Sequence, residues 1–288
     1  MIAPFAVLLV LALQRPSDST FVSPAWLAQH LHDPNLVLLQ VGTRANYDST
    51  HIPGAQFLDV QDIVTPRNSR PMFELPYPDV LDSALARHGI SNDSRVVLYW
   101  GNDWVTPTTR AYLTLDWAGM GERTSILSGG LPAWRAEGRP VTTEVPTVVR
   151  GSFVTRPQVG VVVGADYVAA HLGRRGVTLV DARDPKFYRG DYPASVRDPR
   201  PGHIPGAVSV PFDSIVNDSN VVKSVAALRA LFAAAHVPAG DTVVAYCHVG
   251  QQATLVWLGA RLAGYEARLY DGSYTEWGTL VQYPVERP

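Results

Sequence analysis

Cys247 is the only cysteine of this 288-residue chain, and its surroundings favour nucleophilic chemistry. It ends the apolar run 243–246 and begins a short loop that leads into a helix-forming stretch. Backbone N–H groups in such a turn, together with the dipole of the following helix, stabilise a negative charge at their centre. We therefore expect the Cys247 thiol to ionise more readily than a free one. The alternative is that Cys247 is a small buried hydrophobic residue.

The loop after Cys247 offers several groups that could assist a thiolate. Its residues are His248, Val249, Gly250, Gln251 and Gln252. Gly250 permits a tight turn that brings backbone N–H groups together. The two glutamines could add amide donors, although they could equally form a solvated helix surface. His248 could bind an anionic donor as a cation or supply a proton to a leaving group.

The elements that would carry this loop follow a βα pattern, in which short apolar runs alternate with longer amphipathic ones. In the C-terminal half we predict strands at 178–181, 207–210, 242–246 and 267–270, and helices at 165–172, 225–235 and 251–263. Gly264 is expected to cap the last of these helices. Ligands of such folds bind beyond the carboxyl ends of the strands, and Cys247 lies at that edge.

An internal repeat organises the chain. The pentapeptide His-Ile-Pro-Gly-Ala occurs at 51–55 and again at 203–207. Two further segments, 96–99 and 128–134, correspond in the same order to 243–246 and 271–277. A duplicated domain with insertions and deletions explains this order. We predict an N-terminal domain at 20–143, a linker at 144–164 and a C-terminal domain at 165–288.

Composition indicates a globular protein, with 46% hydrophobic and 17% charged residues. The net charge of −2, without basic blocks, argues against a nucleic-acid partner. Residues 1–18 include an apolar run that is too short to span a bilayer and suits a signal peptide. We therefore expect a periplasmic or secreted protein that does not insert in a membrane once mature, or a cytoplasmic one if this run is an N-terminal strand or buried helix.

Three motifs of the chain together resemble those of one known family. They are the two His-Ile-Pro-Gly-Ala copies, the strand end Asp181-Ala182-Arg183 and a Cys-x-x-Gly loop after a Val-Val-x-Tyr strand. The chain resembles the tandem-domain rhodaneses, which are thiosulfate or 3-mercaptopyruvate sulfurtransferases. The resemblance implies an α/β fold of two rhodanese-like domains, each a mostly parallel sheet flanked by helices. It also implies that the C-terminal copy is catalytic and the N-terminal copy is not, since Trp100 stands at the position of Cys247.

The resemblance further implies the reaction. Cys247 would accept a sulfane sulfur from thiosulfate or 3-mercaptopyruvate as a persulfide and pass it to a thiol or cyanide, without metal or organic cofactor. The expected partners are these small molecules, and we expect a monomer. A rival interpretation is a non-enzymatic sulfur-carrier or peptide-binding module of the same fold.

Several charged residues are expected to support the Cys247 loop or to bind the sulfur donor. Asp181 and Arg183 would form an ion pair that braces the loop, whereas the first copy has Gln40 and Gly42 at these positions. The family's thiosulfate-type enzymes place basic residues where this chain has Phe187, His248 and Val249. The missing positive charge could come from one of four basic residues before His203, which are Lys186, Arg189, Arg197 and Arg200, although these fit solvated loop charges better. Arg110 of the first copy is a further substrate-binding candidate. Arg110 could line a cleft wall with Trp100, Asp103 and Trp104; the favoured alternative is ordinary packing of the aromatic residues and a surface arginine.

Other cysteine chemistries fit less well. Phosphatases of a related fold class use Cys-x5-Arg, but the sixth residue after Cys247 is Ala253. A Cys-His hydrolase needs a third group to orient the base, and the sequence shows none near His248. His51 and His203 belong to the repeated turn motif, and His30 and His32 have no partners at zinc spacing, so we predict no metal site.

Overall fold

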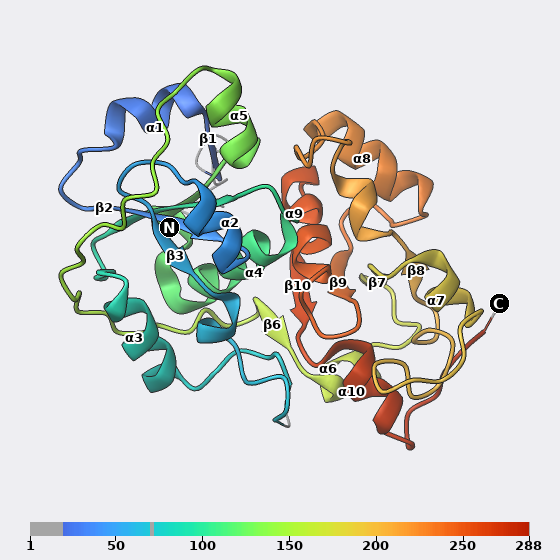
Figure 1. Ribbon diagram of the computed structural model, residues 1–288. Helices are drawn as coiled ribbons and strands as arrows, with labels where there is room; N and C mark the ends of the chain where they lie inside the picture. Colours follow the sequence, from blue (N-terminus) through green and yellow to red (C-terminus); the bar gives the residue numbers. More distant parts are fainter. Residues whose placement is uncertain (1–19, 70–71, 288) are drawn as a thin grey trace, which may run out of the picture.

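The computed structural model describes residues 20–69 and 72–287, and the predicted signal peptide at 1–18 lies outside this range. The chain forms two halves side by side, each built on a five-stranded parallel sheet with helices around it (Figure 1). The strand order is β1-β5-β4-β2-β3 in the first half and β6-β10-β9-β7-β8 in the second. Because the two orders are equivalent position by position, the predicted tandem α/β fold is confirmed.

The first half contains β1 to β5 and α1 to α5. Its strands are β1 (Phe21–Val22), β2 (Leu36–Val41), β3 (Gln56–Leu58), β4 (Arg95–Trp100) and β5 (Thr124–Leu127). Its helices are α1 (Pro24–His30), α2 (Arg44–Ser49), α3 (Pro78–Arg87), α4 (Thr106–Leu115) and α5 (Gly130–Ala136), with 3-10 turns at Val60–Ile63 and Gly121–Arg123 and a π-helical turn at Asp116–Met120.

The second half repeats this arrangement. Its strands are β6 (Val162–Val163), β7 (Val177–Asp181), β8 (Val208–Ser209), β9 (Thr242–Tyr246) and β10 (Ala267–Tyr270). Its helices are α6 (Ala165–Ala170), α7 (Pro185–Arg189), α8 (Val225–Ala234), α9 (Ala253–Ala263) and α10 (Ser273–Thr279), with a 3-10 turn at Phe212–Ile215.

All seven elements predicted for the second half are present, and the ends of several differ from the predicted ones. Strands β9 and β10 have the predicted bounds, and Gly264 caps α9 in the left-handed conformation with φ +99°. Helix α9 begins at Ala253, two residues later than predicted. The delay keeps Gln251 and Gln252 within the loop that follows Cys247.

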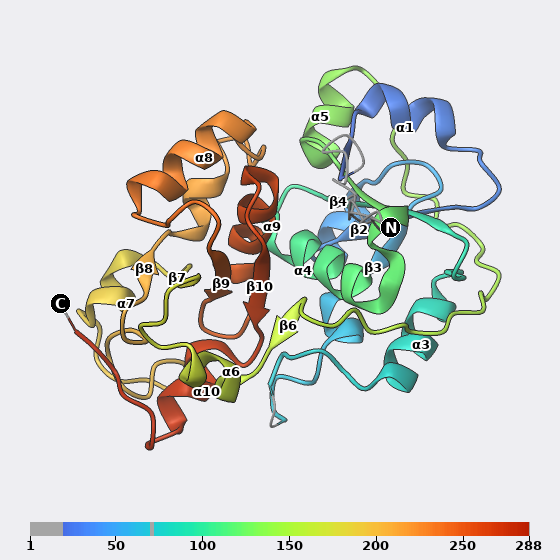
Figure 2. The ribbon, with the colours of Figure 1, turned by 180° about the vertical axis from the view of Figure 1, so that it is seen from behind.

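The core joins the two halves. Each sheet buries an apolar cluster on its outer face, while the inner faces share one cluster that includes residues of α4 and α9. These two helices pack against each other at the boundary between the halves (Figures 1 and 2). Burial of both sheet faces explains why the strands read as short continuous apolar runs rather than alternating ones.

Three polar contacts fix how α4 and α9 meet. Gln251 Nε2 donates to Thr106 Oγ1 at 3.2 Å, and the hydroxyls of Thr109 and Thr254 are 2.7 Å apart. Beyond them Arg261 Nη1 pairs with an Asp116 oxygen at 2.6 Å. The residue numbers in each pair differ by 145, so the helices run parallel with their N-terminal ends together. The loops that precede the two helices therefore lie at the same end of the interface.

The two His-Ile-Pro-Gly-Ala motifs have a structural role in each half. The backbones of His51 and His203 pair with Thr142 and Glu286, which ties a later segment of each half to the turn. Each imidazole also stacks on a tyrosine ring, with centroids 3.9 and 3.8 Å apart. These contacts account for the histidines as turn architecture, as the sequence indicated.

The predicted linker, 144–164, is extended and lies against the first half. Its backbone N–H groups at Gly151, Thr155 and Arg156 donate to Ala86 O, Asp82 Oδ1 and Ala118 O. The last part of the segment is strand β6, which pairs with β10 of the second sheet. Within the described part of the chain, no helix combines the length and the apolar character that a membrane crossing requires.

Candidate active site

Cys247 lies where strand β9 ends, and the loop after it curls around its sulfur. The backbone N–H groups of Ala253, Val249, Gln252 and Gly250 are close enough to the thiol to act on its charged form and lower its pKa. Gly250 makes this possible, because its φ of +79° lies in the left-handed region that side chains disfavour. The loop therefore forms the predicted cradle of main-chain donors.

The pKa of the Cys247 thiol is shifted in the opposite direction from the one we predicted. Only 1% of Cys247 is exposed, and this burial raises the pKa of the thiol above its ordinary value, although the four N–H groups act to lower it. The prediction of a more acidic thiol was therefore wrong for the resting protein. Four neutral donors replace only part of the hydration that a thiolate loses on burial.

The segment that begins α10 holds the Cys247 loop from behind. Cys247 N donates to Ser273 Oγ at 3.2 Å, and Tyr274 N donates to Cys247 O at 2.9 Å. Thr275 N donates to His248 O at 3.0 Å. Ser273 is fully buried and takes a left-handed φ of +54°. We did not identify these residues from the sequence, although 271–277 was one of the repeated segments.

Arg183 and Asp181 form the expected brace. Arg183 Nη2 and Nε donate to Asp181 at 2.6 and 3.0 Å, and both side chains are fully buried. The guanidinium also donates to Asp198 and to Gly202 O, and it lies 3.9 Å from the ring centroid of Tyr274. The backbone N–H of Tyr274 donates to the carbonyl of Cys247, so the ion pair supports the Cys247 loop through Tyr274.

Asp198 connects this brace to His248. Its carboxylate pairs with Arg183 through one oxygen, while its other oxygen lies 3.0 Å from His248 Nδ1. The His248 contact has the distance of an ion pair but not the alignment of a hydrogen bond. The ring of Phe187 meets the imidazole edge to face, with centroids 4.6 Å apart. His248 is thus held between a carboxylate and an aromatic ring.

Asp198 was missed by the sequence analysis, but a signal for it exists. Tyr47 precedes His51 by four residues, whereas the equivalent Tyr188 precedes His203 by fifteen. The extra residues belong to the second copy alone, and they carry Asp198 to the Cys247 loop. An insertion confined to the copy with the cysteine is therefore a signal for functional residues.

The basic candidates occupy different environments. Lys186 is exposed on α7, and Arg189 is exposed and paired with Asp191 at 2.8 Å. Arg197 is exposed in the inserted segment. Arg200 instead donates to carbonyl oxygens at the end of α10 and beyond, which are those of Trp277, Gly278, Leu280 and Tyr283. Arg200 is therefore a structural cap rather than a free cation.

Arg110 reaches the site from the first half. It is fully buried and pairs with Asp271, the residue that follows β10. Gln251, by its hydrogen bond to Thr106, also faces α4 of the first half. The Cys247 loop is thus in contact with the copy that has no cysteine.

The first half has different residues at the positions that correspond to the Cys247 site. Trp100 ends β4 as Cys247 follows β9, and Gln40 lies opposite Tyr99 as Asp181 lies opposite Tyr246. Asp103 accepts a hydrogen bond from Thr43 N at 2.9 Å. A Cβ on Gly42 would lie 2.5 Å from that carboxylate, so the space of an arginine at this position is taken.

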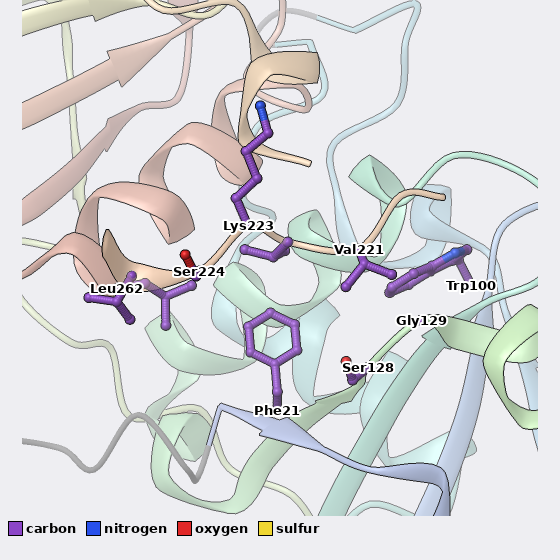
Figure 3. Close-up of a pocket in the computed structure, with 10 residues that line it drawn as sticks. Phe21, Trp100, Ser128, Gly129, Val221, Lys223, Ser224 and Leu262 are labelled. Atoms are coloured by element: carbon purple, nitrogen blue, oxygen red, sulfur yellow. The ribbon is translucent and has the colours of Figure 1, made fainter. Parts of the chain in front are cut away.

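A cavity of about 240 Å³ opens beside Trp100 (Figure 3). Phe21, Val221 and Leu262 point toward it, and Gly129 forms part of its wall. The cavity lies between the halves and is mainly apolar. The first half contributes residues at its strand ends and the second half contributes the segment 221–225 and Leu262, whereas Cys247 and its loop are not among the lining residues.

No group of three or more His, Cys, Asp or Glu side chains suited to a metal ion is present among residues 20–69 and 72–287. The groups that the Cys247 loop presents for chemistry are the thiol, the converging N–H groups and His248. A thiol cradled by N–H groups after a parallel strand, in the second of two equivalent α/β halves, defines a rhodanese-type protein.

Comparison with known proteins places the chain in this class. The rhodanese-like domain family matches residues 23–137 and 164–280, and the chain belongs to this family. The sulfur carrier protein TtuD of Thermus thermophilus is 35% identical over 282 residues, which cover 92% of this chain and 96% of that protein. A Haloferax volcanii protein named "Putative thiosulfate sulfurtransferase" is 33% identical over 286 residues, covering 94% of this chain and 97% of the relative.

Solved structures agree on the fold. The anaerobic ergothioneine biosynthesis enzyme from Chlorobium limicola superposes with a TM-score of 0.82 at 22% identity, covering 93% of this chain and 70% of that one. The structure of YnjE gives a TM-score of 0.82 at 23% identity, covering 93% of this chain and 68% of its own. The family match and the two relatives, rather than these structures, make the chain a rhodanese-family protein of the sulfurtransferase and sulfur-carrier group.

Proposed function

We propose that this protein transfers a sulfane sulfur from thiosulfate or 3-mercaptopyruvate to a thiol or cyanide through a persulfide on Cys247. The observation that carries the proposal is the convergence of four backbone N–H groups on the only thiol of the chain. Such donors stabilise negative charge on sulfur both before and after the transfer. The names of the relatives support the same general activity.

The reaction is a double displacement. The Cys247 thiolate attacks the outer sulfur of thiosulfate, a new S–S bond forms, and sulfite leaves with the electron pair of the old S–S bond. With 3-mercaptopyruvate the C–S bond breaks instead, and the enolate that leaves takes up a proton to become pyruvate. Cyanide or a thiolate then attacks the outer persulfide sulfur, leaves as thiocyanate or a persulfide, and regenerates the Cys247 thiolate.

The chain's own residues would divide the work. The N–H groups of the loop hold the charged sulfur, and Gly250 lets them converge. His248 is the nearest candidate for a proton donor to the leaving enolate or for a cation toward an anionic donor, since the carboxylate of Asp198 orients its ring. Lys186 and Arg189, exposed on α7, can attract an anionic donor by charge.

The burial of Cys247 favours a second candidate function. With 1% of the residue exposed, a donor reaches the sulfur only when neighbouring groups move. Burial also protects a persulfide from water and from small thiols. These properties suit a carrier that receives sulfur and surrenders it to a protein partner, and a relative at 35% identity is named a sulfur carrier.

One experiment separates these functions. The purified protein is incubated with thiosulfate or 3-mercaptopyruvate, its intact mass is measured, and cyanide or a thiol is then added. Sulfurtransferase activity predicts the gain of one sulfur atom, its loss on adding the acceptor, and repeated formation of thiocyanate or pyruvate. A carrier predicts a persulfide that persists with small acceptors.

Cys247→Ser is the control for this experiment, because it removes the thiol while nearly conserving the side-chain size. It should stay folded and gain no sulfur. A wild-type protein that is folded but never gains sulfur from either donor contradicts the sulfurtransferase function and favours the non-enzymatic module.

A further inference from the structure

We infer that Arg110, in the half without a cysteine, is a positioning residue for Cys247 that acts through its buried ion pair with Asp271. This inference rests on the proposed function, because it assigns Arg110 to the loop that would carry the persulfide. It gives the first half a part in the chemistry beyond packing against the second.

The ion pair crosses the boundary between the halves and is sealed from water. Arg110 is fully buried on α4, and 3% of Asp271 is exposed. Arg110 Nη1 donates to Asp271 Oδ1, and Arg110 Nη2 donates to Oδ2 at 3.3 Å. Leu75 N, also from the first half, donates to Oδ2 at 2.8 Å. The position of Asp271 is therefore set by groups of the first half.

Asp271 in turn forms a wall against the Cys247 loop. A Cβ on Gly250 would lie 2.8 Å from Asp271 O, 2.9 Å from Asp271 Oδ1 and 3.1 Å from Arg110 Nη1. The ion pair thus packs directly on the glycine whose turn aims N–H groups at the sulfur. A displacement of either charged group moves the surface on which this turn rests.

Asp271 also begins the segment that holds the loop by hydrogen bonds. Two residues later Ser273 Oγ accepts from Cys247 N, and the next two N–H groups, of Tyr274 and Thr275, donate to the carbonyls of Cys247 and His248. Arg110 therefore reaches the loop by two routes, one through Gly250 and one through this segment. Both routes pass through Asp271.

This geometry distinguishes Arg110 from a residue that binds the donor. Its two terminal nitrogens are already bonded to a carboxylate, and no part of the residue is exposed. Turning the guanidinium toward a donor would leave the Asp271 carboxylate buried and unpaired, which is strongly unfavourable. The role that fits is to hold the loop in place.

The charges of the pair provide a test that separates positioning from electrostatics. If only charge mattered, Arg110→Met would raise the pKa of Cys247, because a carboxylate remains, and Asp271→Ala would lower it, because a guanidinium remains. If the pair positions the loop, both substitutions move the N–H groups away from a sulfur that stays buried in the core cluster, and both raise the pKa of Cys247. The two explanations therefore predict opposite signs for Asp271→Ala.

The experiment titrates the ultraviolet absorbance of the thiolate in the full-length protein, with Cys247→Ser as the blank for tyrosine. A single cysteine makes the signal specific. We expect a rise of about one pKa unit for both Arg110→Met and Asp271→Ala, which is about tenfold less thiolate at neutral pH. We also expect kcat to fall about tenfold with KM little changed, and Arg110→Lys to recover part of the loss.

Two further variants control for stability. Arg261→Met removes the other buried-carboxylate pair of this interface, with Asp116 at the far ends of α4 and α9. It should lower the melting temperature and leave the Cys247 titration unchanged. The double variant Arg110→Met with Asp271→Leu replaces the buried ions by apolar groups, which often preserves stability. The double variant should remain folded, and its Cys247 pKa should lie above that of the wild-type protein, as in the two single variants.

The outcomes are separable from those of the proposed function. An unchanged titration in the double variant, or a lowered pKa in Asp271→Ala, overturns the positioning role. If the wild-type protein gains no sulfur from any donor, the proposed function fails, but the thiolate titration still decides whether Arg110 positions Cys247.

Discussion

Gly250→Ala is the substitution for which the structure gives the clearest expected size of effect. A non-glycine residue at φ +79° costs about 1–2 kcal/mol of conformational energy. The new methyl would also lie 2.8 Å from Asp271 O, where ordinary contact begins at 3.4 Å. The loop must therefore retreat by about half an ångström, and its N–H groups move with respect to the sulfur.

The expected result is a large loss of turnover with a moderate loss of stability. Displacements of this size at a reacting group reduce rates on the order of tenfold to a hundredfold. The assay is thiocyanate formation from thiosulfate and cyanide, or pyruvate formation from 3-mercaptopyruvate and a thiol, with sulfur loading followed by intact mass. The free energy of unfolding is measured in parallel by denaturant titration.

Gly240→Ala is the matched control. Gly240 has φ +89° in the same half, but a Cβ there would meet nothing within 4 Å. It should lose about 1–2 kcal/mol of stability through backbone strain and keep full turnover. If Gly250→Ala retains wild-type turnover, or if both variants lose it equally, the loop geometry does not control sulfur transfer and the reasoning fails.

Other parts of the molecule give three more expected outcomes. Trp100→Cys should not gain sulfur in intact-mass measurements on a Cys247→Ser background, because the first half has Gln40 in place of Asp181; a persulfide there would refute this. Burial, with the nearby charges of Asp271 and Glu276, raises the pKa of Glu74 from 4.5 to about 8. The folded protein then keeps a proton that the unfolded chain loses, so stability should fall as pH rises across this interval. Glu74→Gln should flatten that fall, on the order of 1 kcal/mol after solvent screening, and urea midpoints at both ends of the interval measure it. Asp198→Ala should destabilise the protein by about 3 kcal/mol and lower kcat, since Arg183 loses a buried partner; unchanged unfolding curves would contradict this.

The architecture was largely predictable because it depends on local patterns. Strands buried on both faces read as short apolar runs, and the repeated pentapeptide with two further corresponding segments in the same order indicates the duplication. Gly264 was predicted as a helix cap, and its left-handed φ of +99° confirms this. The strands and the cap arise among residues that are close in sequence, and the duplication shows as a direct repeat of the sequence itself.

The supports of the loop were less accessible to sequence analysis. Asp198 meets Arg183 and His248 only because an insertion folds back over the second sheet. Arg110 meets Asp271 across 161 residues of sequence. Side chains this far apart have no periodicity that links them, so nothing short of their folded arrangement could pair them.

The sequence by itself determined which atom could react and which backbone could surround it. A single thiol after a strand, followed by a glycine, already specifies a sulfur encircled by N–H groups, because turn geometry is local. Only the tertiary structure decided the direction in which the pKa of Cys247 shifts and which residues hold its loop in place. Burial is the sum of contacts from both halves, and here it outweighs four hydrogen bonds and raises the pKa of Cys247.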